Sequence, residues 1–177
     1  MSKALLVIDM LNDFLDKEGV LYIGPSAEEV KKNVAEKVND RRNNGVPIIY
    51  IMDRHLENDA EFNMFPPHCL AGKWGSEIVP EIAPQRGEYL IYKRRFSAFF
   101  GTDLDLTLRE LGVSTLEITG VCTQICVLYT AADARMRHYD VVVSENCVAS
   151  FDDEAHRFSI QQMEKTLGVK VLKGEDV

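Results

Sequence analysis

The sequence predicts one α/β domain over residues 1–177, in which helices cover both faces of a six-stranded parallel sheet. Six short apolar runs alternate with helix-like segments, which is typical of parallel strands joined by crossover helices. The first run, residues 4–8, is apolar at every position, as in strands buried on both faces. A chain of this length can bury one substantial core, and no repeat or linker divides it. We therefore expect a three-layer αβα, Rossmann-like fold.

The other elements follow from hydrophobic periodicity and from local start and stop residues. Ser26 with Glu29, and Ser150 with Asp153, have the spacing of helix-capping pairs. The expected strands lie at residues 46–52, 89–92, 115–119, 140–144 and 169–172, and the expected helices at residues 26–43, 103–111, 127–138 and 150–167.

A long irregular segment is expected at residues 56–86, which hold four of the six prolines and the single tryptophan. Unstructured segments of this length in compact domains are usually either functional or disordered. The aromatic residues of the segment and His68 favour a functional loop.

Composition and local motifs argue against several classes of function. The chain has 20 basic and 28 acidic residues, a net charge of −8 and no basic cluster, so we expect neither nucleic-acid nor membrane binding. No signal-peptide pattern precedes the first strand, which favours a cytoplasmic protein with four free cysteines. No glycine-rich phosphate loop follows that strand, so we expect no nucleotide cofactor.

Polar residues follow four of the predicted strands. Asp9, Asp53, Lys93 and Cys126 each lie at or just past the carboxyl end of a strand. In a parallel sheet these ends share one edge, so the four side chains are expected to converge there.

Cys126 is the candidate nucleophile, because it is expected in the first turn of a helix, where N–H groups and the helix dipole stabilise a thiolate. Asp9 is suited to take the thiol proton, and the Lys93 ammonium can offset the negative charge of Asp9. The alternative is a small core cysteine beside an ordinary Asp9–Lys93 ion pair.

A second candidate site consists of Asp53, His55 and His68, with Glu61 as a fourth group. Residues i and i+2 at a strand end point the same way, so Asp53 and His55 can chelate one ion. Histidine and carboxylate ligands suit zinc, manganese or iron. The alternative is a solvated polar loop.

Three blocks of this chain resemble those of the isochorismatase-like cysteine hydrolases, and within them the nicotinamidases. The blocks are Asp9 with Asn12-Asp13-Phe14, Lys93 with Ser97-Ala98-Phe99, and Gly120-Val121-Cys122-Thr123 with Cys126-Val127. Asp53-Arg54-His55, Glu61 and Phe65-Pro66-Pro67-His68 match the metal-binding residues of the nicotinamidase branch. The resemblance covers essentially the whole chain.

The resemblance implies hydrolysis of nicotinamide, and of pyrazinamide, through a thioester on Cys126. The implied biological role is NAD salvage. It implies a catalytic triad of Asp9, Lys93 and Cys126, and an oxyanion hole from the backbone N–H groups of Cys122 and Cys126, with a cis Val121–Cys122 peptide. It also implies one divalent ion, with zinc favoured over manganese or iron, and a homo-oligomer. Aromatic substrate contacts are expected from Phe14, Phe65 and Phe99.

Two positions depart from the family pattern. Gln124 stands where the family usually has aspartate, and the bulky Arg54 separates Asp53 from His55. Both bear on substrate preference and not on the reaction class. The alternatives are another amidase of the superfamily, acting on an N-carbamoyl or ureido compound, and a non-catalytic binding module.

Overall fold

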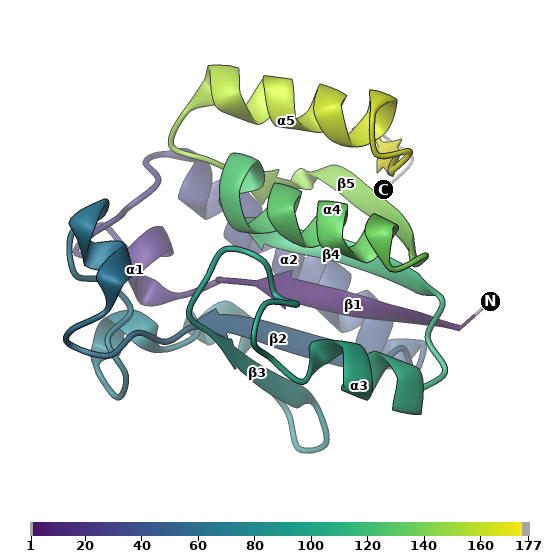
Figure 1. Cartoon of the computed structure of the whole chain (residues 1–177), viewed down its shortest axis with the longest axis horizontal. Coiled ribbons are helices and arrows are strands. Elements are labelled where there is room, and N and C mark those ends of the chain that lie inside the picture. Colours follow the sequence, from purple (N-terminus) through teal and green to yellow (C-terminus); the bar gives the residue numbers. More distant parts are fainter. Residues whose placement is uncertain (1, 175–177) are drawn as a thin grey trace.

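One sheet of six parallel strands forms the centre of the computed structural model, which describes residues 2–174 (Figure 1). Its strand order is β3-β2-β1-β4-β5-β6, which confirms the predicted parallel α/β fold. The order reverses between β1 and β4, where open α/β sheets form a ligand crevice. The strands are β1 (Lys3–Ile8), β2 (Ile48–Asp53), β3 (Tyr89–Lys93), β4 (Thr115–Val121), β5 (Asp140–Ala149) and β6 (Lys170–Leu172).

Helices cover both faces of this sheet and give the predicted three layers. They are α1 (Asn12–Leu15), α2 (Ser26–Asn43), α3 (Leu104–Glu110), α4 (Leu128–Met136) and α5 (Asp153–Lys165). Figure 1 shows α3 and α4 in front of the sheet and α2 behind it. Alternate residues of β1 enter two separate cores: Leu5 and Val7 pack with α1 and α2, and Leu6 and Ile8 pack with α3, α4 and α5. This division explains why residues 4–8 of β1 are all apolar.

Both predicted helix caps are wrong. Pro25 is the N-cap of α2, and Ser26 Oγ instead donates a hydrogen bond to the carbonyl of Ser150. The N-cap of α5 is Asp152, whose carboxylate accepts a 2.9 Å hydrogen bond from the Ala155 N–H. Because β5 runs to Ala149, five residues beyond the predicted end of that strand, α5 begins later than predicted.

The segment between β2 and β3 is irregular, as expected, but three short 3-10 helices and two isolated bridges organise it. The 3-10 helices are η1 (Ala60–Asn63), η2 (Trp74–Ser76) and η3 (Pro80–Ile82). One bridge joins His55 to Leu70, and the other joins Leu11 to Ile78. Both bridges join residues past the carboxyl ends of β1 and β2, so this part of the segment lies there, opposite the N-terminus. The chain then returns to the amino end of β3 (Figure 1).

Gly120 allows β4 to pass close to β1. Its φ is +111°, and a Cβ at this position would lie 1.9 Å from the carbonyl oxygen of Ile8. Only glycine fits such a contact. The residues after β4, including Cys126, consequently begin next to the end of β1, where Asp9 lies.

All four cysteines are buried free thiols, as predicted. Within residues 2–174, no helix combines the length and the apolar character that crossing a membrane requires.

Candidate active site

The carboxyl ends of the central strands bring Asp9, Asp53, Lys93 and Cys126 together, as the sequence predicts. In the sheet register, Ile8 lies between Ile51 and Gly120, and Asp53 lies opposite Lys93. All four polar side chains are buried. We call Asp9, Lys93 and Cys126 the thiol cluster.

Lys93 is the cation at the centre of this cluster. Its Nζ lies 2.8 Å from Asp9 Oδ2, 2.5 Å from Asp53 Oδ1 and 3.4 Å from Cys126 Sγ. Burial by itself would lower the pKa of the Lys93 ammonium, but the Asp53 and Asp9 carboxylates raise it well above its usual value. Lys93 therefore stays positively charged at 0% exposure.

Asp9 is a carboxylate that can exchange a proton near neutral pH. Burial and the negative charge of Asp53 raise the pKa of Asp9 to about 6, against the opposing effect of Lys93. The Asp53 N–H donates a 2.8 Å hydrogen bond to Asp9 Oδ1, which fixes the carboxylate. The backbone of Asp9 is left-handed, with a φ of 51°, so the chain turns sharply as it leaves β1.

Cys126 lies in a π-helical turn, Thr123–Val127, which precedes α4. The prediction placed it in the first turn of an α-helix and expected a stabilised thiolate. Burial instead raises the pKa of the Cys126 thiol well above its usual value, although Lys93 opposes this shift. The resting group is thus a thiol that needs a base, and a carboxylate oxygen of Asp9 lies within 4.8 Å of the sulfur.

The loop before Cys126 is held by hydrogen bonds on both sides. The Cys122 carbonyl accepts hydrogen bonds from the N–H groups of Ile125 and Val127, at 3.0 and 3.3 Å. Thr123 is fully buried, and its Oγ1 lies 2.9 Å from Nδ1 of His156 on α5. The Val121–Cys122 peptide is cis, as the resemblance implies.

A second buried group lies beside the thiol cluster. Each member offers one ligand atom, and these atoms lie within 4.8 Å of one another; the members are Asp53, His55, Glu61 and His68. We call this set the ligand cluster. His55 Nε2 lies 3.6 Å from Asp53 Oδ2 and 3.9 Å from Glu61 Oε1. His68 Nε2 lies 3.8 Å from the same Asp53 oxygen and 3.9 Å from the same Glu61 oxygen.

These separations fit ligands arranged around one small cation. Ligand atoms at zinc bond lengths in a tetrahedral site lie about 3.4 Å apart, slightly closer than the atoms here. His55 Nδ1 is 3.1 Å from Asp59 Oδ2, and His68 Nδ1 is 2.8 Å from the Pro66 carbonyl, which leaves both Nε2 atoms facing the carboxylates. His55 Nε2 and Glu61 Oε2 are buried without a hydrogen-bond partner among the described residues. The donor set therefore fits a divalent metal.

Backbone contacts to Asp13 and His55 bring His68 into this cluster. Asp13 Oδ2 accepts a 2.6 Å hydrogen bond from the Cys69 N–H, next to His68. The His55 N–H and carbonyl bond to Cys69 and Ala71 at 3.0 and 2.9 Å. The two imidazole rings consequently lie edge to face, with centroids 4.7 Å apart.

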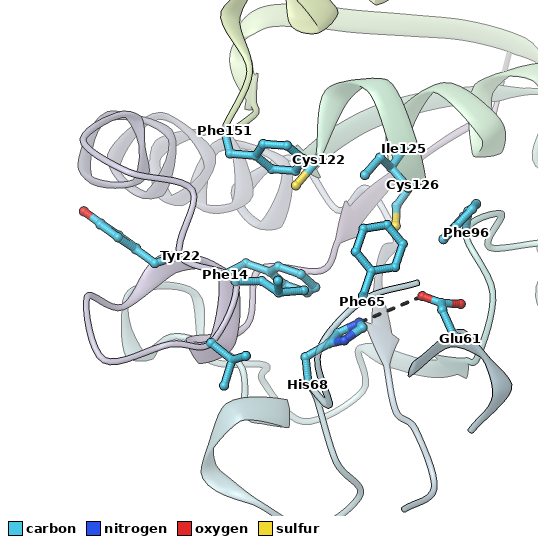
Figure 2. A pocket seen from close by; sticks show the side chains of 12 residues that line it. Phe14, Tyr22, Glu61, Phe65, His68, Phe96, Cys122, Ile125, Cys126 and Phe151 are labelled. Carbon is cyan, nitrogen blue, oxygen red and sulfur yellow. Dashed lines mark ion pairs between the residues drawn. The ribbon is translucent and has the colours of Figure 1, made fainter. Parts of the chain in front are cut away.

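One apolar pocket of about 440 Å³ is lined by Cys126 of the thiol cluster and by Glu61 and His68 of the ligand cluster. Figure 2 shows the Cys126 sulfur on one side of this pocket, His68 and Glu61 on another, and the ring of Phe65 between them. The lining residues are Phe14, Val20, Leu21, Tyr22, Glu61, Phe65, His68, Phe96, Cys122, Ile125, Cys126 and Phe151. None of these lining residues is lysine or arginine.

Of the three predicted aromatic contacts, Phe14 and Phe65 line the pocket and Phe99 does not. Phe99 is in the core between the sheet and the front helices, where it stacks on Tyr139 with ring centroids 6.0 Å apart. The prediction for Phe99 is therefore wrong, because the chain after Lys93 turns this ring into the core. Phe96 lines the pocket instead. The one sequence signal for Phe96 is its position between Lys93 and Ser97, in a block that resembles the family.

The two positions that depart from the family pattern do not line the pocket. The Arg54 guanidinium lies 4.4 Å from the centroid of the Tyr92 ring. Gln124 is half-buried in the π-helical turn, and neither residue is part of the pocket lining. Sequence analysis missed Asp59, a fully buried carboxylate beside His55.

Known proteins with this fold match nearly the full length of the chain. The nicotinamidase/pyrazinamidase PncA from Bacillus subtilis is 34% identical, with a TM-score of 0.92 over 97% of this chain and 99% of that one. N-carbamoylsarcosine amidase from Thermoplasma acidophilum is 33% identical, with a TM-score of 0.90 over 100% and 99% of the two chains.

Pyrazinamidase of Pyrococcus horikoshii, solved in complex with zinc, is 28% identical, with a TM-score of 0.91 over 98% of this chain and 100% of that one. The family described as "Isochorismatase domain" matches residues 3–176. On these grounds the chain belongs to the isochorismatase family.

Proposed function

We propose that this isochorismatase-family protein is a metal-assisted cysteine amidohydrolase that converts nicotinamide into nicotinate and ammonia. One observation carries the proposal: the candidate nucleophile Cys126 lines the same aromatic pocket as Glu61 and His68, two members of the ligand cluster. A planar amide with a ring nitrogen can contact both at once. The solved nicotinamidase and pyrazinamidase neighbours agree with this substrate class.

In this proposal Asp9 takes the thiol proton while Cys126 Sγ forms a bond to the carboxamide carbon. The backbone N–H groups of Cys122 and Cys126 hold the resulting oxyanion. When the carbon–nitrogen bond breaks, Asp9 returns its proton to the leaving ammonia and a thioester remains. Asp9 then deprotonates a water that attacks the thioester carbon. When the carbon–sulfur bond breaks, nicotinate is released and Asp9 returns this proton to Cys126 Sγ. Lys93 balances the negative charge of Asp9 and of the thiolate at both stages.

Asp53, His55, Glu61 and His68 would hold the divalent ion, and zinc is favoured by the ligand types and by the zinc-bound pyrazinamidase neighbour. When bound, the ion supplies a Lewis-acidic contact for the pyridine ring nitrogen. Phe14 and Phe65 would flank the ring and exclude water from it.

The pocket lining favours nicotinamide over the acidic substrates of the alternative function, an amidase of N-carbamoyl or ureido compounds. N-carbamoyl and ureido acids carry a carboxylate, whose burial requires a cationic or hydrogen-bonding partner. The lining residues supply no lysine or arginine, Glu61 among them is acidic, and in this proposal the ring nitrogen of the substrate occupies the metal ion. A neutral amide such as nicotinamide or pyrazinamide is therefore the better match, which would give the protein a role in NAD salvage.

The test is ammonia release by zinc-loaded protein from nicotinamide and, in parallel, from N-carbamoylsarcosine. We expect release from nicotinamide, loss of that release in Cys126→Ala, and little turnover of the acid. Preference for the acid would contradict the proposed substrate and retain the amidase class. Slow labelling of Cys126 by iodoacetamide together with no turnover of either compound would indicate a non-catalytic binding module.

A further inference from the structure

Asp59 is a buried carboxylate that sequence analysis did not single out and that the thiol cluster does not use. Its side chain is 0% exposed, although it lies in the loop that follows β2. Burying a carboxylate is costly unless hydrogen bonds and opposite charges compensate it. The partners of Asp59 therefore indicate why it is retained in the interior.

Two of these partners belong to the ligand cluster. Asp59 Oδ2 lies 3.1 Å from His55 Nδ1, which fixes the ring so that Nε2 faces Asp53 and Glu61. Asp59 Oδ1 accepts a 3.1 Å hydrogen bond from the Glu61 N–H and caps η1, the short helix that carries Glu61. Asp59 thus orients two ligands: it contacts the side chain of His55 and the backbone N–H of Glu61.

The other two partners are cations from the end of β3. Arg94 Nε donates a 2.8 Å hydrogen bond to Asp59 Oδ2, and Arg95 Nη1 donates a 2.9 Å hydrogen bond to Asp59 Oδ1. The arginine side chains are 50% and 40% exposed, so they cover Asp59 from the solvent side. Arg94 and Arg95 follow Lys93 directly in the sequence. The same segment therefore supplies the cation of the thiol cluster and holds Asp59, which supports the ligand cluster.

We propose that Asp59 is a positioning residue for the metal centre, which orients His55 and Glu61 together and is itself held by Arg94 and Arg95. This inference rests on the metal centre of the proposed function. Carboxylates that hold the distal nitrogen of a metal-bound histidine typically change metal affinity by about 10- to 100-fold when mutated. Asp59 has the additional contact to Glu61, so its loss should disturb two ligands.

The experiment compares Asp59→Asn, which keeps the size of the side chain and removes its charge, with the wild-type protein. The zinc dissociation constant is measured by competition with a chromogenic chelator. A Co²⁺-loaded sample of each protein reports the ligand geometry through its visible absorption. The control is Asp105→Asn, because Asp105 also accepts a 2.9 Å hydrogen bond from an arginine but lies outside the site.

We expect the zinc dissociation constant of Asp59→Asn to rise about 10- to 100-fold, with an altered Co²⁺ spectrum, while Asp105→Asn matches wild type. A dissociation constant within twofold of wild type and an unchanged spectrum would overturn the role of Asp59. If wild-type protein binds neither zinc nor Co²⁺, the metal centre itself is refuted and this inference with it.

A second variant covers the case in which Asp59→Asn does not fold. Arg94→Gln with Arg95→Gln removes both half-exposed cations and leaves Asp59 in place; it also removes the Arg95 Nη1 that lies 3.9 Å from Glu61 Oε2, so Arg94→Gln alone is measured beside it. We expect weaker zinc binding by about threefold or more in this double variant, since each removed charge-assisted hydrogen bond loosens Asp59. Wild-type affinity in the double variant would overturn the proposed anchoring.

Discussion

The thiol cluster and the ligand cluster lie side by side and share the neighbourhood of Asp53, but different structures position them. The thiol cluster is built on strand ends, where the sheet register fixes the spacing of Asp9, Lys93 and the start of the Cys126 loop. Three of the four ligands of the ligand cluster instead lie beyond the strand, in the irregular segment before β3.

Asp53 links the two clusters through its two oxygens. Its Oδ1 lies 2.5 Å from Lys93 Nζ, whereas its Oδ2 faces His55 at 3.6 Å and His68 at 3.8 Å. The comparison teaches that the sheet places reactive groups by backbone pairing, whereas the loop needs buried side chains such as Asp13 and Asp59 to place its ligands. Changes to the thiol cluster should therefore affect chemistry, and changes to the ligand cluster should affect metal and substrate binding.

The largest expected effect separates the two cysteines that line the pocket. Cys126→Ala removes the nucleophile and should lower nicotinamide turnover by at least about 10⁴-fold, with zinc content unchanged. Cys122→Ala retains the backbone N–H that holds the oxyanion and should lower turnover by less than about tenfold. Steady-state ammonia release and metal analysis measure both. Substantial activity in Cys126→Ala would remove it as the nucleophile.

Lys93→Met tests the charge balance that both clusters share. It leaves the Asp9 and Asp53 carboxylates buried without their cation, so turnover should fall by about 10² to 10⁴-fold. The free energy of unfolding should also fall, by about 3–5 kcal/mol. Lys37→Met is the control, because Lys37 is another buried lysine that donates a 2.8 Å hydrogen bond to Ser144 away from the site. Equal loss of turnover in the two variants would show that Lys93 is only structural.

His68→Ala should act on the ligand cluster alone. We expect the zinc dissociation constant to rise by at least about 100-fold, because one of four ligands is lost. Removing the metal by chelation should lower turnover of nicotinamide at least about tenfold more than that of benzamide, which has no ring nitrogen. His138→Asn, at a left-handed position remote from the ligand cluster, is the control. Equal losses for the two amides would assign the metal a structural role.

The smallest effect is expected from the support of the Cys126 loop. Thr123→Val removes the hydroxyl that lies 2.9 Å from His156 Nδ1 and keeps the shape of the side chain. A lost hydrogen bond of about 1 kcal/mol corresponds to a roughly fivefold fall in kcat. Thr119→Val, which removes a 2.9 Å hydrogen bond to Leu6 within the sheet, should lower stability and leave kcat unchanged. The same kcat in both variants would show that the Thr123 contact does not position the loop.

The sequence by itself determined the sheet and the residues at its edge. Runs that are apolar at every position, such as residues 4–8, have one stable arrangement, with both faces covered by helices. Parallel pairing then fixes which residues meet at the carboxyl edge, and Asp9, Asp53, Lys93 and Cys126 follow from strand ends alone. The four metal-ligand candidates came from residue type and from resemblance, and the structure places them together.

Only the tertiary structure decided the positions that depend on long-range contacts. Phe99 and Phe96 are three residues apart in one loop, and packing against Tyr139 selects which ring enters the core. The protonated state of the Cys126 thiol depends on burial by the surrounding elements, which a local helix pattern does not report. Asp59 was missed for the same reason, because its partners Arg94 and Arg95 are 35 and 36 positions away in the sequence.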